Sequence, residues 1–143
     1  IVVDDCVAFS GGLDVTIRRW DTSAHEYDHP LRCDPAGKYY RPFHDVQMVV
    51  EGDAARTIGK LARGRWECAC GERIAPCRNV NDCWPENLDA DFRDVEVGIS
   101  RTQPAYESQP QVQEVEALFL DSIGKTASRL SLAPHFGCAV ISE

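Results

Sequence analysis

Residues 1–14 constrain the fold more than any other stretch of this chain. They form two short apolar runs rich in Val and Ile, separated by Asp4-Asp5 and followed by Gly11-Gly12. Asp tolerates the backbone conformations of tight turns, so this spacing predicts a β-hairpin. The paired glycines end the second strand, because Gly weakens a strand and permits a turn.

Beyond the hairpin, strand-like and helix-like patterns alternate. The predicted elements are a strand at 46–50, a helix of about four turns at 53–66 with Asp53 as its N-cap, a strand at 95–99, a helix of roughly 17 residues from Val115, and a strand-like run at 130–132. The stretches 21–44 and 67–93 are rich in turn residues and predict irregular connections. This alternation indicates an α/β fold.

Composition narrows the class of protein. The chain has 143 residues, a single domain at most, and a compact chain of this length buries roughly 70% of its unfolded surface, enough for a sizeable core. Its net charge of −8 argues against non-specific nucleic-acid binding, which depends on Lys and Arg. No apolar run approaches the ~20 residues that a membrane-spanning helix needs. Seven Cys, an odd count without a secretion signal, favour a reducing compartment, and we expect a cytoplasmic protein.

Several short motifs resemble successive landmarks of the phospholipase D family. The opening stretch is similar to the back half of the signature His-x-Lys-x4-Asp-x6-Gly-Gly-x-Asp, with Asp4 as its Asp. The landmarks, in matching order, are Gly11-Gly12-Leu13-Asp14, Arg19-Trp20-Asp21-Thr22, Tyr40-Arg41-Pro42-Phe43-His44-Asp45-Val46-Gln47, Arg63-Gly64-Arg65-Trp66 and Val97-Gly98-Ile99-Ser100-Arg101-Thr102.

The resemblance implies a partial phospholipase D-like half-domain, a mixed sheet flanked by helices, with residues 1–143 as one incomplete domain. Residues 1–14 would be the tail of the first catalytic motif, whose His and Lys lie just before residue 1. Residues 130–143 depart from the family pattern, and the second motif would belong to the other half of a longer parent. By resemblance that parent is an enzyme, whereas the chain alone, lacking His-x-Lys, is expected to be inactive.

The family's chemistry assigns roles to residues near the hairpin. A His attacks phosphorus to form a phosphohistidine, and the His of the other motif protonates the leaving alcohol. Asp4 would be a catalytic residue that orients the catalytic pair; its alternative is an ordinary turn Asp. The residues expected to bind substrate are Gly11, Gly12, Asp14, Arg19 and Trp20, and for Arg19 and Trp20 the packing alternative is favoured.

The resemblance also implies which partners the parent has. They are a phospholipid substrate and the second half of the parent chain. The resemblance also allows peripheral contact of the intact parent with a membrane. Neither a cofactor nor a metal is implied.

Two alternatives remain open. The chain could be a non-catalytic family member that binds a phosphate or a partner. It could also be an interaction domain stabilised by zinc at Cys68, Cys70, Cys77 and Cys83, although the spacing lacks two Cys-x2-Cys knuckles and free buried Cys is the default. His44-Asp45 has the look of a His oriented by a carboxylate, but a packed His with a satisfied hydrogen bond is the favoured interpretation.

Overall fold

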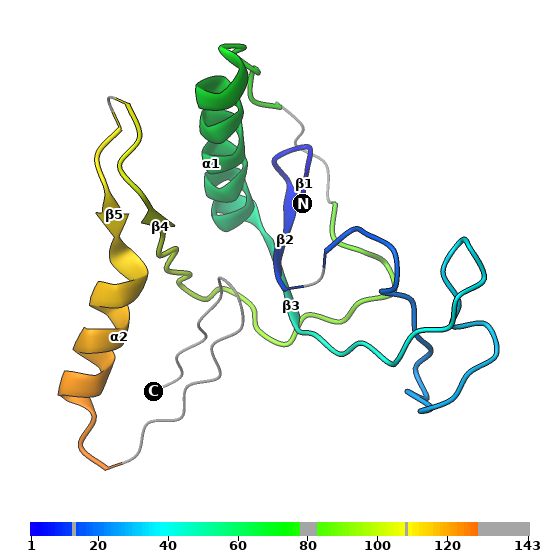
Figure 1. Cartoon of the computed structure of the whole chain (residues 1–143). Coiled ribbons are helices and arrows are strands. Elements are labelled where there is room, and N and C mark those ends of the chain that lie inside the picture. The colour runs from blue at the N-terminus through cyan, green and yellow to red at the C-terminus, as the bar shows by residue number, and fades with distance from the viewer. Residues whose placement is uncertain (13, 78–82, 108, 129–143) are drawn as a thin grey trace.

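The computed structural model describes residues 1–12, 14–77, 83–107 and 109–128 (Figure 1). The elements in chain order are β1 (Val2–Val3), β2 (Val7–Gly11), β3 (Gln47–Glu51), α1 (Gly52–Cys70), β4 (Thr102–Gln103), β5 (Val112–Gln113) and α2 (Glu114–Lys125). Strands and helices are therefore both present, as predicted. Every pairing between these strands is antiparallel, in the sheets β1-β2-β3 and β4-β5, so the predicted mixed sheet is wrong for the described residues.

The predicted hairpin is confirmed. Val3 pairs with Val7, and the Cys6 amide donates to the Val3 carbonyl at 3.0 Å. Asp4 and Asp5 have φ of 51° and 54°. Positive φ at both central positions is what a type I′ turn requires, and this turn matches the twist of the two strands.

Gly11 owes its place to a close approach between strands. It pairs with Gln47 at the start of β3, where a Cβ on Gly11 would lie 2.6 Å from the Gln47 Cα and would collide with the Val46 carbonyl oxygen. The next amide, Gly12, donates to that same carbonyl at 3.3 Å. Gly11 is thus required by the neighbouring backbone.

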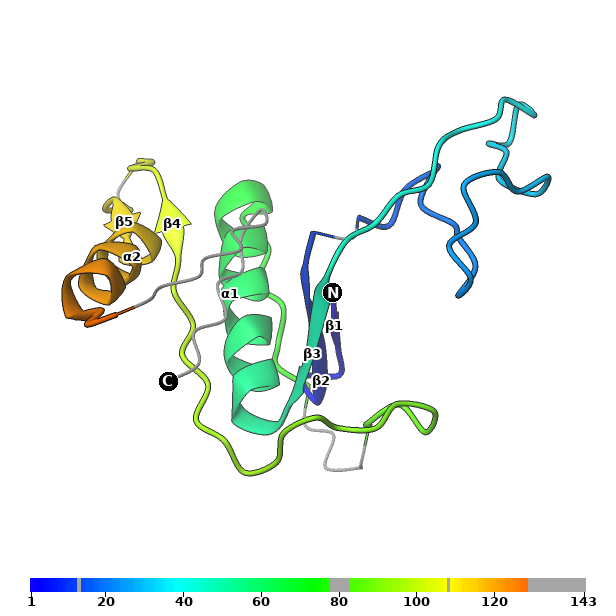
Figure 2. The same cartoon turned by 90° about the horizontal axis from the view of Figure 1, so that it is seen from below.

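Helix α1 covers one face of the three-stranded sheet. The small core at this contact consists of Ala8, Val50 and Ala55, with Ile58 packed against it. Figure 2 shows α1 as a middle layer, with the sheet on one side and the β4-β5 hairpin and α2 on the other.

The ends of α1 differ from the prediction. Its N-cap is Glu51, and Asp53 lies in the first turn, where a carboxylate complements the helix dipole. The helix continues beyond Trp66 to Cys70. There Gly71, with φ of 70°, donates its amide to the Glu67 carbonyl at 2.8 Å, a left-handed C-cap.

In the second half of the chain, the elements differ more from those predicted by the sequence. Residues 95–99 form no strand, and β4 begins only at Thr102. The polar stretch 103–110, expected to be irregular, contributes to the β4-β5 hairpin. Helix α2 has 12 residues, fewer than expected, and the run 130–132 lies outside the described residues.

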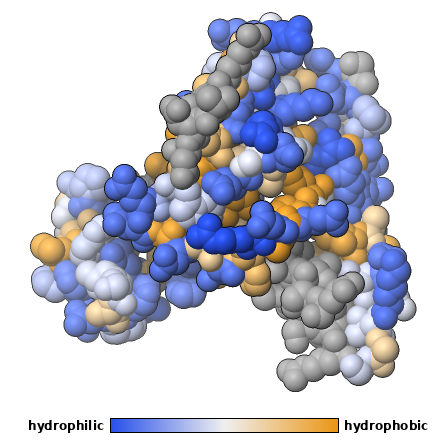
Figure 3. Space-filling view, turned by 180° about the vertical axis from the view of Figure 1, so that it is seen from behind, coloured by the Kyte–Doolittle hydropathy of each residue, from blue (hydrophilic) through white to orange (hydrophobic). Residues whose placement is uncertain are grey.

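The core is much smaller than the length of the chain predicts. Among the described residues, the buried apolar side chains are Val7, Ala8, Val50 and Ala55. The accessible surface is 11709 Å², whereas a compact monomer of this mass exposes about 7,400 Å². Figure 3 shows apolar side chains open to solvent in the middle of one face. The expectation of a sizeable core is therefore wrong. No helix in the described part of the chain is long and apolar enough to cross a bilayer.

Candidate functional site

Asp4 and the glycine pair, which the sequence places in one motif, lie at the two ends of β2. Asp4 occupies the β1-β2 turn and is exposed, whereas Gly11 and Gly12 lie at the far end of the strand. Five strand residues span about 16 Å. Asp4 is therefore not brought together with the glycine pair. We call the Gly11-Gly12 end of β2, with the chain that leaves it and the residues that enter β3, the glycine end.

Arg19 is the main cation of the glycine end. Its guanidinium lies 4.1 Å from the centre of the Phe43 ring, a cation–π contact. Its Nη2 is 3.5 Å from Asp14 Oδ2, and its Nη1 is 3.4 Å from the Arg18 carbonyl. Both distances are long for charge-assisted bonds, which are usually 2.7–2.9 Å. Its Nε is buried and has no partner in the described part of the chain, so the donor capacity of Arg19 that a ligand can use lies in the two weakly bonded Nη groups.

Trp20 takes part in packing within the loop. Its ring meets that of His29 edge-on with centroids 5.2 Å apart, and its carbonyl accepts a hydrogen bond from the Tyr40 hydroxyl at 3.2 Å. The side chain remains about half exposed. These contacts match the packing alternative, and they leave part of the ring open to a ligand.

Two histidines meet near the same end. The rings of His25 and His44 are 5.9 Å apart in an edge-on arrangement, and His25 Nδ1 lies 3.3 Å from Asp21 Oδ2. His44 stands two residues before Val46, whose carbonyl binds Gly12. From the sequence, His25 has no spacing that implies a site, and His44 was interpreted as a packed residue because no partner nucleophile is visible. The signals available for His44 were the neighbouring Asp45 and its position inside a family-like landmark.

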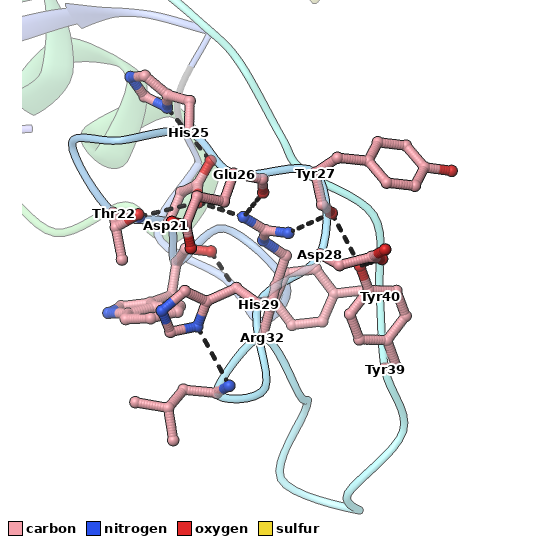
Figure 4. A network of polar contacts seen from close by, with 12 residues as sticks. Asp21, Thr22, His25, Glu26, Tyr27, Asp28, His29, Arg32, Tyr39 and Tyr40 are labelled. Atoms are coloured by element: carbon pink, nitrogen blue, oxygen red, sulfur yellow. Dashed lines mark hydrogen bonds and ion pairs between the residues drawn. The ribbon is translucent and has the colours of Figure 1, made fainter.

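A buried arginine organises the loop that carries His25 (Figure 4). Arg32 is fully buried, and its guanidinium donates to Asp21 Oδ1 at 2.5 Å and to the carbonyls of Glu26 and Tyr27 at 2.7 and 2.9 Å. The hydrogen bond from Arg32, with a second from the Thr22 amide, lowers the pKa of Asp21 to about 2. Asp21 therefore stays ionised at neutral pH and links the Arg32 network to His25. Sequence reasoning missed this network, which has no local pattern.

A second polar centre lies at the opposite end of the hairpin. The buried Asp5 carboxylate accepts hydrogen bonds from Arg63 of α1 and, at 2.9 Å, from the Cys77 amide. Burial acts to raise the pKa of Asp5, but the hydrogen bonds from Arg63 and Cys77 outweigh it, and the pKa lies below its ordinary value. Asp5 thus ties the turn to α1 and to the segment after it.

The cysteines form neither the zinc site nor the set of free buried thiols that the sequence suggested. Cys6 and Cys83 form a disulfide with their Cα atoms 5.9 Å apart, which runs against the expectation of a wholly reduced chain. Cys68, Cys70 and Cys77 are free but exposed, so the default of buried thiols is wrong for them. The proposed zinc quartet is not assembled, because Cys83 is in the disulfide. The described residues contain no group of three or more potential metal ligands.

Comparison of the chain with protein-family models, curated proteins and solved structures finds no match. The glycine end is therefore the feature from which we infer a function. It combines a glycine-rich strand end, an arginine with spare donors and two neighbouring imidazoles, a set that can bind an anion and exchange protons.

Proposed function

We propose that this chain forms part of a phospholipase D-like phosphodiesterase or phosphatidyltransferase and binds the phosphodiester of a phospholipid at the glycine end. The observation that carries the proposal is the state of Arg19. The two Nη groups of Arg19 make only long hydrogen bonds, so they can turn to a stronger anionic acceptor, and the planar fork of a guanidinium suits phosphate.

The strand register supports the same location. Val2 lies opposite Ala8, and Val3 opposite Val7, so each step back along β1 is one step toward the glycine end. In the signature His-x-Lys-x4-Asp, with Asp4 as the Asp, a β1 continued in the same register would bring the Lys opposite Gly11, and the His would lie two residues farther along the same edge. The motif and the spare cation would then converge on one phosphate.

In this proposal each residue of the glycine end has a chemical role. Arg19 would hold non-bridging oxygens and stabilise the charge that develops on them. His25 and His44, whose rings are 5.9 Å apart, would supply neighbouring imidazoles for proton exchange, while protonation of the leaving alcohol would stay with the His of the second motif. Asp4, at the other end of β2, has a turn role in this proposal.

Affinity for a soluble phosphodiester tests the proposal. We expect dibutyryl phosphatidylcholine to bind the chain, and Arg19→Ala to weaken binding about tenfold or more, because a hydrogen bond to a charged group contributes roughly 1.5–3 kcal/mol. Lys38→Ala is the matched control, since it removes an exposed cation elsewhere in the same loop. Equal affinities for wild type, Arg19→Ala and Lys38→Ala in titration calorimetry would reject the proposal.

Turnover is a separate question. No His-x-Lys occurs in the chain, and loss of a catalytic nucleophile elsewhere costs on the order of 10⁶ in kcat. We therefore expect binding without hydrolysis of bis-(p-nitrophenyl) phosphate. Hydrolysis above that of a mock purification would show that other residues supply the nucleophile.

A further inference from the structure

Residues of α1 and of the segment 99–114 line a groove. It lies on the side of α1 that faces the β4-β5 hairpin, and Figure 2 shows that the three-stranded sheet is on the other side of this helix. The volume of the groove is about 820 Å³. Apolar parts of its wall come from Leu61 of α1 and from Ile99, Pro104 and Tyr106 across the groove. None of these residues belongs to the glycine end.

The charge of the groove is opposite to that of the chain. Lys60 and Arg65 of α1 line it and have no ion-pair partner among the described residues. The acid in the described wall, Glu114, is neutralised by Arg101, which binds it at 2.9 Å through Nε and at 2.5 Å through Nη2. Two uncompensated cations therefore face an apolar groove in a chain whose net charge is −8.

The volume of the groove indicates what kind of ligand fits it. Pockets for small molecules usually measure about 300–1,000 Å³, and this groove falls within that range. Gly64 also lines the groove, and a Cβ at this position would meet no atom within 4 Å, so the groove is open there. An elongated apolar body with one anionic end matches both the shape and the charge.

We propose that the α1 groove binds a single-chain anionic amphiphile, with its alkyl chain against Leu61, Ile99 and Tyr106 and its anionic head at Lys60 and Arg65. This site goes beyond the phosphodiester site at the glycine end and does not depend on it. The two sites can fail separately, because Arg19 is not part of the groove.

Alkyl phosphates of increasing length, kept below their micellar concentrations, test the proposal by titration calorimetry. We expect octyl, decyl and dodecyl phosphate to bind with rising affinity, by up to about fourfold for each CH₂ that becomes buried. Dodecyltrimethylammonium should bind more weakly than dodecyl phosphate, and inorganic phosphate should not compete at equal concentration. Failure of dodecyl phosphate to bind, or affinity independent of chain length, would overturn the proposal.

Three variants locate the binding. Arg65→Glu should lower affinity about tenfold, whereas Arg56→Glu, the same charge reversal at an exposed helix position paired with Asp53, should change it less than about twofold. Gly64→Leu should fill the groove and abolish binding while circular dichroism shows the helix retained. Equal affinity in Gly64→Leu and wild type would refute the location. If wild type sediments as a dimer that Gly64→Leu dissociates, the groove is an interface between copies and the proposal fails.

Discussion

Asp4 and Asp5 share one turn but have different environments. Asp4 is exposed and has positive φ, whereas the Asp5 carboxylate is buried between Arg63 and the Cys77 amide. The sequence motif draws attention to Asp4, yet the contacts that join hairpin, helix and following loop belong to Asp5. We therefore expect substitutions at the two positions to act on different properties.

At position 4, the free energy of unfolding of a variant should depend on how well the substituted residue tolerates positive φ. Asp4→Ala should lower the free energy of unfolding by about 1 kcal/mol, because Ala with positive φ has a steric cost that Asn and Gly largely avoid. Asp4→Asn should leave stability within a few tenths of a kcal/mol, since Asn favours this turn. Urea unfolding of the variants gives the order. Equal loss in both would mean that the carboxylate itself matters, as a catalytic or hydrogen-bonding group.

At Asp5, the expected effect depends on pH. Asp5→Asn should cost about 2 kcal/mol at pH 7, because it leaves the partly buried Arg63 guanidinium without its anion. The folded pKa of Asp5 is lowered, so its stabilisation is present above the unfolded pKa of about 3.9 and is lost as pH falls through the folded pKa. The gap between wild type and variant should narrow on acidification. Parallel stability curves from pH 7 to pH 2 would contradict this.

At the scale of elements, Gly59 and Gly64 in the interior of α1 have opposite surroundings. Gly59 is buried, and a Cβ there would collide with the Asp5 carboxylate, whereas a Cβ on Gly64 would meet open space. Only Gly59 is therefore required by close approach. Gly64 retains the intrinsic cost of glycine inside a helix.

Matched alanine substitutions should separate the two positions. Gly64→Ala should stabilise the chain by about 0.5–1 kcal/mol, the difference in helix propensity. Gly59→Ala should destabilise by about 1–3 kcal/mol, because overpacking displaces the Asp5–Arg63 contact. Chemical denaturation of both variants measures this. A stabilising Gly59→Ala would show that α1 does not lie against Asp5.

Secondary-structure elements that depend on neighbouring residues in the sequence could be predicted. The hairpin follows from its turn, and α1 from apolar spacing, although Gly71 was the available signal for its true end. The strand expected at 95–99 failed because alternation supplies a face but no neighbouring strand. The β4-β5 hairpin was missed for the opposite reason, since its polar residues carry no apolar pattern.

At the scale of the whole molecule, little apolar burial holds the chain together, and a covalent link therefore matters more. The Cys6–Cys83 disulfide closes a loop with a sequence separation of 77 residues and joins the hairpin turn to the segment beyond α1. Linking such distant positions restricts the unfolded chain considerably. The Asp5 contacts reinforce the same junction.

Cys83→Ser should therefore lower the free energy of unfolding by about 2–4 kcal/mol. Cys70→Ser is the control, because it removes an exposed free thiol nearby in the sequence. Urea unfolding of both variants, with and without reductant, measures the effect. A wild type whose stability is unchanged by reductant would show that the disulfide makes no contribution.

The candidate site could be predicted only in part. Gly11, Gly12, Asp14 and Arg19 are close in sequence, and the motif placed them together. His25 and the Arg32 network became visible only through contacts made across the loop at 21–40. Asp4 shows the opposite case. It belongs to the same sequence motif as Gly11 and Gly12, but the strand β2 separates it from them in space.

Amide chemical shifts during titration with dibutyryl phosphatidylcholine locate the bound phosphodiester residue by residue. We expect the largest changes at Gly11, Gly12 and Arg19, little change at the Asp4 amide, and loss of these changes in Arg19→Ala. A pattern centred on the Asp4 turn or on α1, or one that persists in Arg19→Ala, would contradict a phosphodiester site at the glycine end.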